Sequence, residues 1–332
     1  MSQAWRHSFR LGINHHLLFP ASLANAEAHR ATLPEVLGYT EFELVDMMSW
    51  EDGAALERQR RLVETSGKEP IYNCPLMNAL GRNPHSPVEA EREAALAEMQ
   101  SHLQRAKTLG ARKAVIASGP NAPASQRDRQ TELFVRYVAE LCGRHPELTL
   151  MIEPFDSSIG KNLLIGPTHE AADVVERVRR LGLANIGLLI DMGHVPLQGE
   201  TFGEALRAAA PYIGHVHLGS CIMRDPAHPL YGDNHPPWGD PQGENDVPEA
   251  SRFLRGLLEV GYLKDGPGAD TGQDAGHCSE DRTQLPTVTL EMRPYTDRTE
   301  RDSVERFLEK LDDAWSQATD TTIIAEPGGE PI

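Results

Sequence analysis

The sequence is poor in cysteine and in basic residues, and each shortage excludes a class of protein. Its four cysteines lie far apart among 332 residues without a Cys-x-x-Cys spacing, which excludes a zinc ribbon or a disulfide framework. Such cysteines are typical of reduced, mostly buried thiols in a cytoplasmic protein. Only 32 Lys and Arg stand against 49 Asp and Glu, for a formal charge of −17. Because phosphate binding needs clustered cations, this balance argues against nucleic acid or an anionic membrane as a partner.

Segments for membrane insertion or export are also missing. No apolar run approaches the roughly 18 residues of a transmembrane helix. The N-terminal residues 1–16 have no apolar stretch after their basic residues, so they do not resemble a secretory signal. With 39% hydrophobic and 24% charged residues, the chain has enough apolar surface for a large core and is not a disordered acidic protein.

What the chain has instead is a regular alternation of short β-rich runs and helical patterns. Apolar residues at helical spacing predict helices over 89–109, with Gly110 as its stop, and over 128–142, with Gly143 as its stop. The β-rich runs between the helical patterns predict eight strands, at 9–14, 42–47, 69–74, 113–118, 148–153, 186–191, 213–218 and 287–292.

Eight βα units predict a single α/β domain, a (β/α)₈ TIM barrel over residues 1–318. The alternative of an open sheet normally carries a Gly-rich turn after its first strand, which this sequence lacks. An insertion at 221–247 follows the seventh strand, so we expect it on the face that carries the active site. A second insertion, 264–284, precedes the eighth strand and should lie on the opposite face. Residues 319–332 are expected to form a flexible tail.

Acidic and imidazole side chains stand at the carboxyl ends of the last four predicted strands. Glu153, Asp191, His217 and Glu291 end strands five to eight, and strand periodicity places each on the same face as the residue two positions earlier, namely Met151, Leu189, His215 and Thr289. A single acid at a strand end is more often a helix cap or an ion-pair partner. Four compatible residues on four successive strands favour a divalent metal site, because three clustered carboxylates repel without a cation. His215, one layer deeper, is interpreted as a core histidine.

This ordered set, with Asp191-x-x-His194 and His-Val-His around His217, resembles the xylose isomerase-like TIM barrels. That superfamily includes sugar-phosphate isomerases and epimerases, ketose 3-epimerases and endonuclease IV-type enzymes. The resemblance to ketose 3-epimerases implies that Glu153, Asp191, His217 and Glu291 bind one divalent ion, usually manganese or cobalt. It further implies that the two glutamates act as acid and base on opposite faces of the sugar, and that His194 contacts a substrate oxygen.

The sequence also departs from these relatives. Ketose 3-epimerases have a further Glu after the strand-five glutamate, where this chain has Gly160 and Lys161. They have an Arg six residues after the strand-seven histidine, where Met223 stands with Arg224 one position later. Strands three and four lack the histidines that endonuclease IV needs for its zinc cluster. The sequence Asp-Asn-His at 233–235 nevertheless resembles a pair used in that family. These comparisons and the loop positions give five candidate substrate contacts: His16, Lys161, Arg224, His235 and Trp238.

The expected function is a divalent-metal-dependent isomerase or epimerase of a small keto-sugar. Three carboxylates and one imidazole favour Mn²⁺, with Mg²⁺ or Co²⁺ as alternatives. The ion would stabilise an enediolate while the two glutamates, Glu153 and Glu291, move the proton. The alternative is a metal-dependent lyase or deglycosidase of 3-keto- or C-glycosides on the same scaffold, favoured by the missing Glu and the long 221–247 loop. A nuclease and a non-catalytic sugar-binding barrel are disfavoured, and a homo-oligomer is compatible with the sequence.

Overall fold

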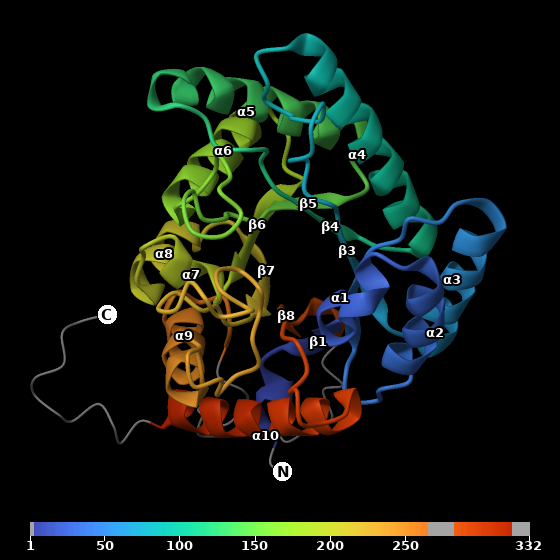
Figure 1. The fold of residues 1–332 in the computed structure, drawn as a ribbon, viewed down its shortest axis with the longest axis vertical. Helices are drawn as coiled ribbons and strands as arrows, with labels where there is room; N and C mark the ends of the chain where they lie inside the picture. The colour runs from blue at the N-terminus through green and yellow to red at the C-terminus, as the bar shows by residue number, and fades with distance from the viewer. Residues whose placement is uncertain (1–2, 265–281, 321–332) are drawn as a thin grey trace, which may run out of the picture.

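Eight parallel strands close into a barrel in the computed structural model, which describes residues 3–264 and 282–320 (Figure 1). Each strand pairs with the next, and β8 pairs with β1 to complete the ring. The predicted (β/α)₈ barrel is therefore confirmed, with the sixth and seventh strands as predicted and the other six shorter by one or two residues at one or both ends. The strands are β1 (Arg10–Asn14), β2 (Leu44–Met47), β3 (Glu69–Asn73), β4 (Lys113–Ile116), β5 (Thr149–Ile152), β6 (Ile186–Asp191), β7 (Ile213–Leu218) and β8 (Thr287–Leu290).

The helices form the outer layer around this barrel (Figure 1). The helix predicted over 89–109 is confirmed, and it ends at Gly110 in the left-handed conformation (φ 88°). The predicted stop at Gly143 is wrong, because α5 continues to Arg144. Among the described residues, no helix has the length and apolar character needed to cross a membrane. The α-helices are α1 (His15–Leu18), α2 (Ala26–Leu37), α3 (Gly53–Ser66), α4 (Glu89–Leu109), α5 (Arg127–Arg144), α6 (Thr168–Arg180), α7 (His194–Leu197), α8 (Phe202–Ala209), α9 (Val247–Glu259) and α10 (Glu300–Thr319).

Side chains inside the barrel form an apolar layer below a polar one. The apolar layer is a buried cluster contributed by five strands, and two residues further along β2, β5 and β6 the same faces present acids, because side chains alternate along a strand. The strand sequences therefore place polar groups at the carboxyl end of the barrel, above a packed apolar floor. The floor consists of Leu44, Ile71, Val115, Met151 and Leu189.

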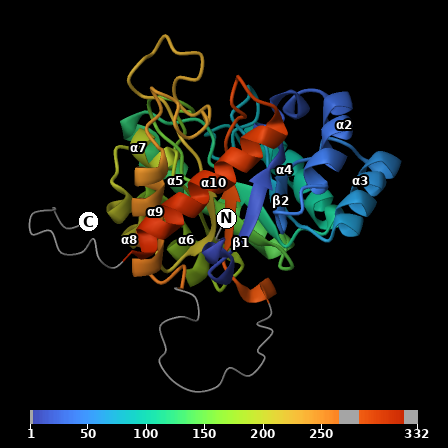
Figure 2. The ribbon, with the colours of Figure 1, turned by 90° about the horizontal axis from the view of Figure 1, so that it is seen from below.

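The connection from β7 to α9 is the longest described loop, residues 219–246, and it rises above one end of the barrel (gold in Figure 2). It corresponds to the insertion predicted at 221–247. The second predicted insertion, 264–284, lies mostly outside the described residues. Its last part, Arg282–Gln284, is a 3₁₀ turn, and the Arg282 guanidinium donates to the carbonyl of Phe9, next to the start of β1. Most of the predicted tail, 319–332, also lies outside the described residues.

Gly12 on β1 provides a test of barrel packing. A Cβ at this position would lie 2.4 Å from Thr289 Oγ1 and 2.9 Å from Leu44 Cβ, so neighbouring strands require a glycine. We expect Gly12→Ala to lower the free energy of unfolding by about 1–3 kcal/mol, as overpacking does. Gly143→Ala is the matched control. Gly143 is exposed on α5 with nothing near its Cβ position, so the substitution should leave stability unchanged or slightly raised. Urea unfolding of both variants measures the difference, and equal stabilities would contradict the packing argument.

Candidate metal centre

The four predicted ligand residues meet at the carboxyl end of the barrel. Asp191 ends β6 and His217 lies near the end of β7, whereas Glu153 and Glu291 directly follow β5 and β8. Each offers one ligand atom, these atoms all lie within 4.8 Å of one another, and all four residues are buried. Strand periodicity therefore brings together the residues that the sequence singles out.

The contacts within this group leave several electron-pair donors facing one another. His217 Nδ1 lies 2.6 Å from Glu291 Oε2, 3.9 Å from Glu153 Oε1 and 4.0 Å from Asp191 Oδ2. Asp191 Oδ1 accepts the backbone N–H of Gly193 at 2.5 Å, but its buried Oδ2 makes no hydrogen bond to any described residue. Three carboxylates and an imidazole fit a divalent ion, which would take up these lone pairs.

Burial and mutual repulsion change the pKa values of the carboxylates. Burial raises the pKa of Glu153 to about 7, and Glu291 contributes to the rise while His194 opposes it. Burial also raises the pKa of Asp191 well above its usual range, with Glu291 adding to the effect. Burial alone would raise the pKa of Glu291, but His217 and His235 beside it hold that pKa below its usual range. Without a cation, the cluster therefore carries protons that an arriving ion has to displace.

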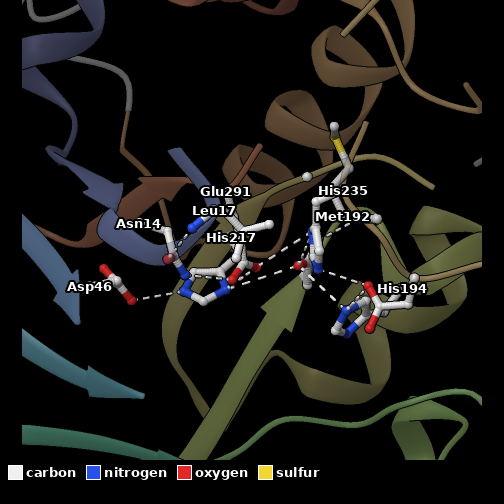
Figure 3. A network of polar contacts seen from close by, with 12 residues as sticks. Asn14, Leu17, Asp46, Met192, His194, His217, His235 and Glu291 are labelled. Carbon is white, nitrogen blue, oxygen red and sulfur yellow. Dashed lines mark hydrogen bonds and ion pairs between the residues drawn. The ribbon is translucent and has the colours of Figure 1, made fainter. Parts of the chain in front are cut away.

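A second polar group adjoins the four ligands, as Figure 3 shows at His194 and His235. Asp233 lies between these two imidazoles, with its Oδ1 3.1 Å from His194 Nε2 and 2.8 Å from His235 Nε2. His194 Nδ1 lies 3.5 Å from Glu153 Oε1. His194, His235 and Asp191 also offer ligand atoms within 4.8 Å of one another. The predicted site residues His194 and His235 are therefore brought to the same centre.

His235 reaches the centre from the loop 219–246 and not from a strand. Its backbone is in the left-handed region (φ 49°), and its carbonyl oxygen accepts the N–H of Arg293, just beyond β8. Gly219 makes room for it, since a Cβ there would lie 2.8 Å from Asp191 Oδ1 and 3.1 Å from His235 Nδ1. The loop is thus attached to the strand ends at the position where it contributes its imidazole.

Lys161 also lies beside this group. Its ammonium donates to the carbonyl oxygen of Asp233 at 3.0 Å and lies 3.3 Å from the Asp233 carboxylate, and a third of its side chain is exposed. The segment that carries Lys161 is ordered by Asp156, a buried carboxylate that accepts four consecutive backbone N–H groups, from Ser158 to Lys161. Lys161 therefore presents a cation next to His194 and His235.

The side chains of the three other predicted substrate contacts have partners elsewhere in the structure. Trp238 is fully buried, and its indole N–H donates to the Gly219 carbonyl, so no ring face is available for a sugar. Arg224 pairs with Glu244, and 73% of its side chain is exposed. His16 is buried, with its Nδ1 2.9 Å from Ser22 Oγ and its Nε2 accepting the Met48 N–H.

Three polar residues of the centre were missing from the sequence-based site. Asn14, the last residue of β1, donates from Nδ2 to Glu291 Oε1 at 2.7 Å. Asp46 on β2 accepts from His217 Nε2 at 2.9 Å. Asp233 was noticed only as part of the Asp-Asn-His pair. Asn14 and Asp46 share the pattern of the predicted ligands, a polar residue near the end of an apolar strand. The same pattern could therefore have predicted both residues, but only the last four strands were expected to supply the site.

Comparison with known proteins identifies the family to which the barrel belongs. A model of the family described as xylose isomerase-like TIM barrel matches residues 35–267. The chain belongs to this family. One relative is a D-psicose 3-epimerase of Agrobacterium fabrum, 30% identical over 95 residues, which are 26% of this chain and 31% of that protein. The matched segment therefore spans about a third of the relative's length.

Solved structures resemble the whole barrel. A D-psicose 3-epimerase from Clostridium cellulolyticum H10, solved with D-tagatose, has a TM-score of 0.60 at 17% identity, with 93% of this chain and 98% of that chain covered. The IolI protein, solved with a zinc atom, has a TM-score of 0.64 at 15% identity, with coverage of 94% and 100%. At these identities the likeness establishes the fold.

Loss of one carboxylate should separate metal binding from folding. Asp191→Asn replaces a charged carboxylate of the proposed metal site with a neutral amide. Loss of a residue that only hydrogen-bonds a metal ligand typically costs about 10–100-fold in affinity, so loss of this ligand charge should weaken Mn²⁺ binding by more than that. Isothermal titration calorimetry measures the affinity, and circular dichroism should show an intact fold. Asp313→Asn, the same change at an exposed residue of α10, is the control and should bind as wild type. Unchanged affinity in Asp191→Asn would contradict this assignment.

Metal affinity should also depend on pH. The pKa of Glu153 is raised to about 7, and the pKa of His217 lies well above its usual value because of the acids around it. Below about pH 7 these groups hold protons that an ion must displace, so affinity should fall by at least about tenfold per pH unit as the pH drops from 7 to 5. Titrations in buffers of different ionisation enthalpy would count the protons released. A flat profile would contradict the assigned ligands.

Proposed function

We propose that this protein is a divalent-metal-dependent isomerase or epimerase of keto-sugars, with Mn²⁺ held by Glu153, Asp191, His217 and Glu291. The observation that carries the proposal is the convergence of these four buried donors at the mouth of the barrel. The similarity to a D-psicose 3-epimerase supports a small carbohydrate as the substrate. The bound zinc of the IolI protein supports a divalent ion on this scaffold.

A bound ion would polarise a carbonyl oxygen and its neighbouring hydroxyl and so stabilise negative charge on the sugar. The glutamates would move the proton between sugar and protein. Glu291, whose pKa is held low by His217 and His235, stays ionised and is able to accept a proton from the carbon beside the carbonyl. Glu153, with a pKa of about 7, is able to return a proton near neutral pH. Removal of the proton by Glu291 would give an enediolate, and return of a proton by Glu153 would give the epimer or isomer.

The neighbouring residues would bind and orient the substrate. Asp233 contacts the imidazoles of both His194 and His235, which favours His194 as a hydrogen-bond donor to a sugar oxygen. Lys161 supplies a second donor next to it. Asn14 holds one oxygen of Glu291, which leaves the other oxygen for the ion or the proton.

A lyase that cleaves 3-keto- or C-glycosides is the alternative. The observation that favours it is Lys161, a cation placed beside His194 where ketose 3-epimerases have an acid. Proton abstraction next to a carbonyl would then expel a leaving group from the neighbouring carbon. The two reactions share their first step and differ in the product.

Incubation of the Mn²⁺-loaded protein in D₂O distinguishes these reactions. The substrates are D-psicose, D-fructose and D-tagatose in one set and 3-keto-glycosides in another. Deuterium in a rearranged sugar supports the isomerase or epimerase, whereas release of an aglycone supports the lyase. Absence of both, in protein that binds Mn²⁺, would overturn the proposal.

Glutamine substitutions should separate proton transfer from metal binding. Glu153→Gln and Glu291→Gln each retain a carbonyl oxygen for the ion but cannot accept a proton. We expect measurable Mn²⁺ binding and a loss in kcat of about 10²–10⁴-fold, the usual contribution of a general acid or base. His194→Ala is the comparison variant and should keep its Mn²⁺ affinity while KM rises. The glutamate variant that loses hydrogen exchange with solvent identifies the base. If both variants turn over within tenfold of wild type, neither glutamate is the base.

A further inference from the structure

Asp46 on β2 is a buried carboxylate that the proposed chemistry does not use. It has no exposed surface and lies inside the barrel on the far side of His217 from the other acids (Figure 3). Its Oδ1 accepts the hydroxyl of Thr289 at 2.6 Å, and its Oδ2 accepts His217 Nε2 at 2.9 Å. The Nε2 of His215 lies 3.3 Å from the same Oδ2. Three side chains therefore direct polar atoms at one carboxylate.

His215 is held by Thr287 and does not donate to Asp46. Its Nδ1 lies 2.8 Å from Thr287 Oγ1 and 3.1 Å from the Thr287 carbonyl oxygen. A carbonyl oxygen only accepts hydrogen bonds, so the proton of the neutral His215 ring is on Nδ1. The hydrogen bonds that Asp46 accepts therefore come from Thr289 and His217.

The contact with Asp46 fixes one proton on His217. A carboxylate has no hydrogen to give, so the ring nitrogen that faces Asp46, Nε2, carries a proton. Nδ1 faces the other acids, and a bound cation would displace any proton there, which leaves the Nδ1 lone pair for the ion. Nδ1 is the atom 2.6 Å from Glu291 Oε2 and within 4.0 Å of Glu153 and Asp191. We propose that Asp46 is a positioning residue that holds His217 in the tautomer whose Nδ1 lone pair binds the metal ion.

This inference rests on the proposed metal site and assigns a role to a residue outside the four proposed ligands, although Asp46 also offers a ligand atom close to those of His215 and His217. A histidine that binds a metal commonly donates its other N–H to a carboxylate, which orients the ring and raises its basicity. Loss of such a partner typically costs about 10–100-fold in metal affinity. In Asp46→Asn the amide oxygen takes the place facing Thr289, and the NH₂ group faces Nε2. That arrangement moves the proton of His217 to Nδ1, where it blocks the ion.

Mn²⁺ titration of wild type, Asp46→Asn and Thr289→Val tests the inference. Asp46→Asn should bind Mn²⁺ about 10–100-fold more weakly. Thr289→Val is the matched control for disturbing this buried group, because it removes one hydrogen-bond donor to Asp46 and keeps the carboxylate. The Mn²⁺ affinity of this variant should stay within about threefold of wild type. Equal losses in both variants would indicate a merely structural role and overturn the inference, as would wild-type affinity in Asp46→Asn. If wild type itself binds no ion, the proposed function fails as well.

The wild-type protein gives a second readout that needs no variant. In protein labelled with ¹⁵N-histidine and loaded with Zn²⁺, long-range ¹H–¹⁵N correlations report which nitrogen of His217 binds the ion. We expect Nδ1 at the metal and a slowly exchanging proton on Nε2. Binding through Nε2 would overturn the inference even if Asp46→Asn fails to fold, while leaving the metal site itself intact.

Discussion

The centre is governed by the electrostatic cost of placing acidic groups together away from water. Glu153, Asp191 and Glu291 are buried within a few ångströms of one another, an arrangement that opposes their simultaneous ionisation. Neighbouring imidazoles offset part of this cost, which accounts for the opposite pKa shifts of Glu153 and Glu291. The barrel tolerates the arrangement because its apolar floor and outer helices supply the core, so the mouth contributes little to packing.

Residues outside the ligand set determine how these groups are held. Asn14 binds one oxygen of Glu291, and Asp46 binds the imidazole of His217 on its opposite edge. Gly12 and Gly219 contribute by having no side chain. A Cβ at Gly12 would overlap Thr289 Oγ1, and a Cβ at Gly219 would overlap Asp191 Oδ1. The reactive groups are thus fixed by strand ends, and the loop 219–246 adds Asp233 and His235 to a frame that is already rigid.

Strand alternation made the barrel and its four principal polar residues predictable. Alternating side chains and apolar strands are local properties, so Glu153, Asp191, His217 and Glu291 were found from their spacing alone. The position of Trp238 depends on distant residues. Trp238 is fully buried, and its carbonyl oxygen accepts hydrogen bonds from the Tyr295 hydroxyl and the Lys310 ammonium, both distant in sequence. Arg224 pairs with Glu244 in the same long loop, where no periodic pattern predicts the partner. Asp46 was not predicted, because its contact with His217 joins β2 to β7, which are distant in sequence.

The pairing of β8 with β1 has a consequence for biosynthesis. This pairing closes the ring, and Asn14 of the first strand reaches Glu291 just after the last. The four proposed ligands come from the ends of β5 to β8, so a nascent polypeptide that has not yet released β8 from the ribosome would hold an incomplete set. The centre is therefore complete only in the closed barrel. Ion uptake would then be confined to fully folded molecules, which protects partly synthesised chains from capturing metal in non-native arrangements.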